Sequence, residues 1–193
     1  MQSICVFCAS GMGKDPVYAQ SARRFGEIMA ARQIRLVYGG SQRGLMGEVA
    51  EGVLQGGGQV TGVIPGFLAT KEIAHMGITE LIRVGTMHER KTRMADEAEG
   101  FVALPGGFGT MDELCEILTW AQLGLHRKPI GIWNINGYYD ALLALFDRMA
   151  EEELLKPTYR QMVLMDQDPE ALLTKMHYYQ PPEVPQWLNE EQV

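Results

Sequence analysis

The chain has 193 residues, of which 46% are hydrophobic, so it is long enough for one α/β core and too short for two domains of typical size. The formal net charge of −7 argues against a general nucleic-acid binder, because polyanion binding needs a clustered basic surface. No run of about eighteen apolar residues is present and the N-terminus lacks the pattern of a signal peptide, so we expect a cytoplasmic protein without a membrane span.

Six short apolar runs, rich in strand-forming residues, are spaced along the chain. They predict strands at residues 3–8, 35–38, 60–64, 81–84, 101–104 and 130–133. Helical patterns fill the intervals. Asp15 with Pro16 predicts the start of a helix that reaches about Arg32, and Asp168 with Pro169 predicts another helix start.

Strands that alternate with helices indicate an α/β fold with a doubly wound, Rossmann-like parallel sheet and helices on both faces. In such a sheet, ligands bind at the carboxyl ends of the strands. We expect a single domain over residues 1–180, followed by a proline-rich acidic tail over residues 181–193.

Two of the three cysteines, Cys5 and Cys8, form a CxxC pattern that is also found in redox and zinc sites. Both lie in the first predicted strand, where a separation of three places their side chains on opposite faces. The sequence has no second CxxC to complete four zinc ligands. We therefore expect buried cysteines and no metal.

Glycine-rich loops follow three of the predicted strands, namely ASGMGK, YGGSQRGLMG and PGGFGT. The first of them does not make a P-loop, which would require Gly and Ser or Thr where the chain has Cys8 and Asp15. It is also a weak dinucleotide fingerprint, because Pro16 stands where a small residue is needed. The third loop, PGGFGT, is therefore the best candidate for a phosphate-binding loop.

The PGGFGT loop connects a predicted strand to a predicted helix. Pro105 ends the strand, two glycines turn the chain, and Gly109 and Thr110 lead into the helix. The unpaired N–H groups and the positive dipole end of that helix would form an anion site that suits a monophosphate. The alternative is an ordinary turn in which Thr110 is only the N-cap.

Glu113 also has two interpretations. With Thr110 it fits the capping box TxxE, in which it would bond to the backbone at the helix start. Alternatively, it could reach a ribose whose ring becomes positively charged when a glycosidic bond breaks. The spacing alone leaves both possibilities open.

A second motif, TMHERKTR, begins with another capping box, Thr86 with Glu89. Gly100 marks the expected end of the helix. The apolar stripe of this helix is predicted to contain Met87, Met94, Ala95 and Ala98. Arg90 and Lys91 fall in the same stripe, and cations on an inward face are costly unless they meet an anion or are paired. The alternative is that both extend to solvent from the first turn.

These motifs resemble the LONELY GUY family, the cytokinin-activating phosphoribohydrolases, whose bacterial members were often labelled lysine decarboxylases. The signature PGGxGTxxE stands at residues 105–113, and MHxRK stands at residues 87–91. Further matches are ICVFC near the start, VYGG followed by GLMG, GVIP and TWAQLGLH. The resemblance covers nearly the whole chain.

The resemblance implies a homodimeric, nucleotide-binding hydrolase that splits a nucleoside 5′-monophosphate into free base and ribose 5-phosphate, with neither metal nor organic cofactor. It implies that Arg90 and Glu113 are catalytic. The residues it implies as nucleotide contacts are Glu72, Lys91, Gly107, Phe108, Gly109, Thr110 and Thr119. A decarboxylase would need pyridoxal phosphate, and no lysine in these motifs is indicated for it.

The second glycine loop departs from the family pattern, since many members have three glycines where this chain has Gly39, Gly40 and Ser41. Together with Ser10, these three residues are candidates for an additional ligand loop. Ser41 could donate a hydrogen bond to phosphate or ribose, or its Cβ could limit close approach. The sequence leaves open whether the substrate is a cytokinin nucleotide, AMP or another monophosphate. It also leaves open a non-catalytic nucleotide sensor that uses the same loop.

Overall fold

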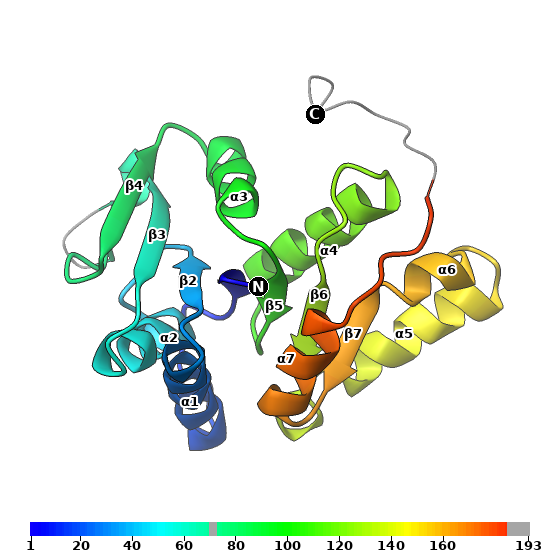
Figure 1. Ribbon diagram of the computed structural model, residues 1–193, viewed down its shortest axis with the longest axis horizontal. Helices are drawn as coiled ribbons and strands as arrows, with labels where there is room; N and C mark the ends of the chain where they lie inside the picture. Colours follow the sequence, from blue (N-terminus) through cyan, green and yellow to red (C-terminus); the bar gives the residue numbers. More distant parts are fainter. Residues whose placement is uncertain (70–72, 185–193) are drawn as a thin grey trace.

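The computed structural model describes residues 1–69 and 73–184 (Figure 1). The strands are β1 (Ser3–Phe7), β2 (Arg35–Tyr38), β3 (Val60–Pro65), β4 (Glu80–Val84), β5 (Phe101–Ala103), β6 (Ile130–Trp133) and β7 (Val163–Asp166). The α-helices are α1 (Pro16–Ala31), α2 (Gly44–Gln55), α3 (Met87–Asp96), α4 (Phe108–Gln122), α5 (Asp140–Glu151), α6 (Pro157–Arg160) and α7 (Pro169–His177). Two short 3-10 helices, η1 (Gly66–Leu68) and η2 (Ile135–Gly137), follow β3 and β6.

The described strands form one parallel sheet in the order β4-β3-β2-β1-β5-β6-β7, with β4 and β7 at opposite edges (Figure 1). This confirms the predicted doubly wound, Rossmann-like fold and all six predicted strands. The edge strand β7 was not predicted. The chain first builds outward from β1 to β4 and then returns to β5, on the other side of β1. The loops after β1 and β5 therefore separate at this switch point, where such sheets bind ligands.

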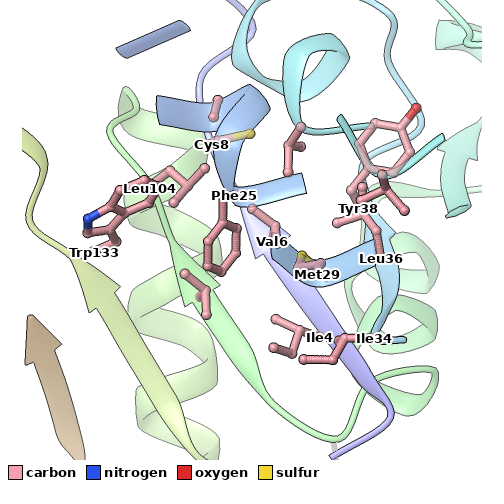
Figure 2. Packing of buried hydrophobic residues seen from close by; sticks show 14 of the residues in the cluster. Ile4, Val6, Cys8, Phe25, Met29, Ile34, Leu36, Tyr38, Leu104 and Trp133 are labelled. Atoms are coloured by element: carbon pink, nitrogen blue, oxygen red, sulfur yellow. The ribbon is translucent and has the colours of Figure 1, made fainter. Parts of the chain in front are cut away.

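Helices cover both faces of the sheet. One core lies between the sheet and α1, α2 and α7, and the other lies between the sheet and α3, α4 and α5. Figure 2 shows the first core, where Phe25 and Met29 of α1 pack against Ile4 and Val6 of β1. Cys8 belongs to this core and Cys5 to the opposite one. Both cysteines are buried on opposite faces, as their spacing predicted.

Two of the predicted helix starts are capped by aspartates. Asp15 accepts a hydrogen bond from Val17 N at 2.9 Å, and Asp168 accepts one from Ala171 N at 2.9 Å. Each cap satisfies an otherwise unpaired N–H group of the first turn, and the proline that follows has the backbone angle a helix start requires.

Helix α3 also begins as predicted but ends earlier. Thr86 accepts from Glu89 N at 3.1 Å, and Glu89 reaches the N–H of Gly85 at 2.7 Å, one residue before the expected Thr86 N–H. The helix ends at Asp96, so Gly100 lies beyond its end. Met87 was predicted to be buried, but it is the first residue of α3 and is exposed, whereas Met94 and Ala95 further along the helix are buried.

The C-terminal segment after α7 returns along the sheet, and Val184 packs against the core beneath α3, α4 and α5. Residues 185–193, most of the predicted acidic tail, lie outside the described residues. In the described ranges 1–69 and 73–184, no helix has both the length and the apolar character needed to cross a membrane.

Candidate active site

The loops that separate at the switch point line a cavity of about 400 Å³. Its walls come from the segment after β1, the first turns of α2 and α4, and one side chain of α3. The lining residues are Cys8, Ala9, Ser10, Gly11, Met46, Arg90, Gly107, Phe108, Gly109, Thr110 and Glu113. The PGGFGT loop, Arg90 and Glu113 therefore meet in one place.

Helix α4 begins at Phe108, and its N-cap is Gly107, which has no side chain to cap the helix. The alternative in which Thr110 is the N-cap is therefore wrong, because Thr110 is the third residue of the helix. Within the described residues, no group accepts a hydrogen bond from the backbone N–H groups of residues 107–110. We call these four N–H groups the anion cradle, since open donors at the positive end of a helix dipole favour an anion.

The start of α2, which also lines the cavity, is closed to an anion. Leu45 N donates to Gly11 O and Met46 N donates to Ala9 O, each at 3.3 Å. Two donors of its first turn are thus used to hold the loop after β1. Of these two helix starts, α4 is the one whose cavity-lining residues offer free donors.

The glycines of the loop have different roles. A Cβ on Gly106 would lie 2.0 Å from Oγ1 of Thr110, so the loop can fold over the buried Thr110 side chain only with glycine there. A Cβ on Gly107 or Gly109 would meet nothing within 4 Å, because both positions face the open cavity. One glycine serves packing, and the other two leave room for a ligand.

Arg90 and Glu113 form an ion pair inside the cavity. Nη1 of Arg90 donates to Oε1 of Glu113 at 2.8 Å, and Nε donates to the carbonyl of Val63 at 3.2 Å. Their side chains are only 12% and 10% exposed. A Cβ on Gly39 would lie 2.1 Å from Nη2 of Arg90, so any larger residue just after β2 would displace the guanidinium from this position. Glu113 is therefore not part of a capping box.

The environment of Glu113 acts on its charge in two directions. Burial raises the pKa of the carboxyl above its ordinary value, and the Arg90 guanidinium partly opposes that rise. Arginine itself stays protonated at any physiological pH. The site thus holds a carboxylate beside a permanent cation, with the open donors of the anion cradle on the same cavity.

Lys91 does not line the cavity, although it lies next to Arg90. Its Nζ is 2.9 Å from Glu116 and 3.3 Å from Asp112, both on α4. The side chain is 16% exposed, so it does not extend to solvent as the alternative supposed. Lys91 joins α3 to α4 and offsets two acids that would otherwise repel an anion at the start of α4.

The other predicted site residues are divided between the cavity and other places. Ser10 lines the cavity, whereas Gly40 does not line it and takes a left-handed φ of 72°. Ser41 is buried and its Oγ accepts from Arg43 N at 3.1 Å, so it stabilises its own loop. Thr119 is exposed on α4 and lines a different cavity with residues of α5 and α6. Glu72 lies outside the described residues.

Sequence reasoning missed four wall residues, Cys8, Ala9, Gly11 and Met46. A signal was available, because the first three flank Ser10 after the central strand and Met46 belongs to the GLMG motif. What the sequence could not show is that the start of α2 packs on the loop after β1. A Cβ on Gly44 would lie 2.2 Å from the Ser10 carbonyl carbon, which shows how closely these segments approach.

The fold and this cavity define a Rossmann-like α/β protein with an anion cradle and a buried Arg–Glu pair at the switch point. Residues 46–176 match the family model described as "Possible lysine decarboxylase". The chain is 47% identical over 178 residues to "Probable cytokinin riboside 5'-monophosphate phosphoribohydrolase LOGL9" of Oryza sativa subsp. japonica, covering 92% of this chain and 78% of that protein. It is 45% identical over 178 residues to "Cytokinin riboside 5'-monophosphate phosphoribohydrolase LOG7" of Arabidopsis thaliana, covering 92% and 82%. The chain belongs to this LONELY GUY family, as its motifs predicted.

Solved structures with the same fold are more distant in sequence. The molybdenum cofactor binding protein from Rippkaea orientalis superposes with a TM-score of 0.69 at 19% identity, covering 91% of this chain and 94% of that one. The molybdenum cofactor carrier protein from Chlamydomonas reinhardtii gives 0.68 at 21% identity, covering 92% and 98%. At such identities the likeness concerns the fold alone.

Proposed function

We propose that the protein hydrolyses the N-glycosidic bond of a purine nucleoside 5′-monophosphate, releasing the free base and ribose 5-phosphate. The observation that carries this proposal is the buried Arg90–Glu113 pair in the same cavity as the anion cradle. A phosphate on the cradle would be held by N–H groups without other partners in the described residues. The relatives at 43–48% identity carry the name of this reaction.

Glu113 is the residue that we expect to assist bond cleavage. N-glycoside hydrolysis passes through a sugar with positive charge at C1′, so a nearby carboxylate stabilises the transition state. Glu113 lies one turn beyond Thr110 on α4, on the same cavity as the cradle that would hold the 5′-phosphate. Its carboxylate is also suited to orient water or to take a proton from it.

Arg90 has a different task, because its proton is held too tightly for general acid catalysis. Its hydrogen bonds to Glu113 and to Val63 O fix the carboxylate in place. In the substrate complex it would orient Glu113 and stabilise negative charge on the departing base. We further propose Gly107, Phe108, Gly109, Thr110 and Ser10 as nucleotide contacts, since all five line the cavity.

A lysine decarboxylase function is not supported by the lysine nearest this site. An amine that forms a Schiff base must lose its proton easily, which requires a lowered pKa. Burial lowers the pKa of Lys91, but hydrogen bonds to Glu116 and Asp112 outweigh burial and leave it above its ordinary value. Lys91 is therefore suited to a permanent ion pair.

The homodimer implied by the resemblance, and the cytoplasmic location expected from the sequence, also remain proposals. Thr119 supports the dimer, because it lies about 9 Å along the axis of α4 from Glu113 at the usual rise per residue, on another surface. If Thr119 contacts the nucleotide, the contact must come from a second copy. Light scattering should give twice the mass of one chain, and a monomeric protein with full activity would contradict this proposal.

The reaction is tested by incubating the protein with AMP, N6-isopentenyl AMP and adenosine, followed by detection of free base and ribose 5-phosphate. We expect release from one or both monophosphates and much slower release from adenosine, because phosphate binding orients the sugar. A non-catalytic sensor would bind AMP without consuming it. Binding without any release from either monophosphate would therefore overturn the proposed hydrolase.

A further inference from the structure

The three carbonyl groups that lead into the anion cradle are held from two segments, the loop after β1 and the turn between η2 and α5. The hydrogen bonds are Tyr139 Oη to Leu104 O at 2.7 Å, Ala9 N to Pro105 O at 3.1 Å, and Tyr138 Oη to Gly106 O at 2.7 Å. The last of these is next to the cradle. Gly107 lines the cavity and Gly106 does not. The peptide between them therefore has one side toward the cavity and the other side toward Tyr138.

In a planar trans peptide, the carbonyl of one residue and the N–H of the next point in opposite directions. When Tyr138 holds the Gly106 carbonyl on the outer side, the Gly107 N–H points to the opposite side. A peptide flanked by two glycines has few steric barriers to rotation, because neither neighbour has a Cβ. A flipped peptide would turn a carbonyl oxygen toward the bound anion in place of a donor.

The Tyr138 ring is partly exposed and packs against two other tyrosine rings. It packs edge-on against Tyr18 at the start of α1, with ring centroids 5.8 Å apart, and against Tyr139 at 5.0 Å. The turn before it is stabilised by Asn134, which accepts from Tyr139 N at 2.8 Å and donates to Asp140 at 2.6 Å. The hydroxyl therefore has a defined place against the loop.

We propose that Tyr138 is a positioning residue for phosphate recognition, which acts by locking the Gly106–Gly107 peptide with its N–H toward the cavity. The inference rests on the proposed function in taking the anion to be the substrate 5′-phosphate. Tyr138 itself lines no part of the cavity, so it acts through the loop. Tyr139 and Ala9 hold the preceding carbonyls, which place the loop but do not orient a cradle donor.

The test is Tyr138→Phe, which keeps the packed ring and removes only the hydroxyl. The net value of one such hydrogen bond corresponds to about a three- to tenfold change in an equilibrium constant. We expect the Kd for inorganic phosphate and for ribose 5-phosphate, measured by calorimetry, to rise by that factor. The KM for the monophosphate should rise in parallel, whereas kcat should stay within about twofold, because the loss concerns binding.

Two neighbouring tyrosines provide matched controls. Tyr18→Phe removes a hydroxyl that has no hydrogen-bond partner among the described residues, so phosphate affinity should not change. Tyr139→Phe removes a buried hydrogen bond to Leu104 and should lower the melting temperature more than the phosphate affinity. Parental phosphate affinity in Tyr138→Phe, or an equal loss in Tyr18→Phe, would overturn the role of Tyr138. A parent protein that binds phosphate but cleaves no monophosphate would overturn the hydrolase alone, and the affinities would still decide this inference.

Discussion

The chain contains the same four-residue pattern, TxxE, at the start of two helices, and the two copies do different things. At α3, Thr86 caps the helix and Glu89 reaches the backbone of Gly85, so both side chains serve the helix itself. At α4, Thr110 caps nothing and Glu113 is buried against Arg90. One copy closes a helix start, and the other leaves it open for a ligand.

The difference lies in where each helix begins. Helix α3 begins directly after its threonine, whereas α4 begins two residues before its threonine. Glu89 is therefore the third residue of α3, whereas Glu113 is the sixth residue of α4. An α-helix has 3.6 residues per turn, so Glu113 lies in the second turn, where it is buried next to Leu114. The N-cap of α4 is Gly107, which has no side chain, so the first N–H groups of this helix stay uncapped.

The largest effect is expected at Glu113, and the same substitution at Glu89 in the other TxxE pattern is its control. Glu113→Gln removes the charge that would stabilise the sugar cation, so kcat for the monophosphate should fall by roughly two to four orders of magnitude. Glu89→Gln should leave kcat unchanged, because glutamine also serves in a capping box. The comparison is made by steady-state release of free base. Equal rates for Glu113→Gln and the parent protein would remove Glu113 from the mechanism.

Arg90→Lys tests what holds the buried glutamate. Lysine keeps the positive charge but cannot reach both Glu113 and the Val63 carbonyl, so kcat should fall by about ten- to a hundredfold.

The ionised Glu113 is the active form, and burial raises its pKa. On acidification, activity should therefore be lost at a higher pH than the one at which an ordinary glutamate becomes protonated. A weaker cation should move this limb of the pH–rate profile to still higher pH. A limb unchanged in Arg90→Lys would contradict the coupling.

The free energy of unfolding should fall as pH rises through the titration of Glu113, whereas activity should rise. The folded-state pKa of Glu113 lies above its unfolded value, so the folded protein binds the proton more tightly. This contribution to stability is present below the unfolded pKa and is lost as pH rises through the folded pKa. Glu113→Gln should flatten that part of the curve of unfolding free energy against pH.

Most of the fold could be predicted from the sequence because its strands are buried apolar runs and two of its helix starts carry Asp–Pro pairs. The edge strand β7 was missed although residues 162–165 are all apolar, because a run of only four residues between two helical segments does not distinguish a strand from part of a helix. The end of α3 was placed too late, because Gly100 marks the turn into β5 and not the helix end.

The site could be predicted only in part, since it is formed by contacts between distant segments. The glycines and the helix that follows them were enough to predict the anion site. Spacing could not decide whether Glu113 caps its own helix or lies buried in the site. That choice depends on Arg90, which comes from another helix and crosses β2 at Gly39. Ser41 was a candidate for the ligand loop, yet its side chain accepts from the backbone of Arg43, a local turn that serine often makes and that the sequence analysis did not consider.

A smaller effect is expected at the glycines that keep α4 open. Gly109→Ala places a methyl group in the empty cavity, so phosphate affinity should fall by about tenfold, whereas helix propensity should raise stability by up to about 1 kcal/mol. Gly106→Ala should do the reverse and lower stability by about 1–3 kcal/mol, because its Cβ meets Thr110. Calorimetry with inorganic phosphate and thermal unfolding separate the two. A loss of stability in Gly109→Ala would mean that this position is not open.

The smallest effect is expected at the cap of α3. Thr86→Ala removes the side chain that accepts from Glu89 N, which should cost about 1 kcal/mol and lower the melting temperature by about 2–4 °C. Thr86→Ser keeps the hydroxyl and should restore the parental value. The kcat should not change in either variant, because Arg90 is held by Val63 and Glu113, beyond the first turn. A fall in kcat without a change in melting temperature would instead mean that the start of α3 positions Arg90, and the two TxxE patterns would then share a part in the reaction.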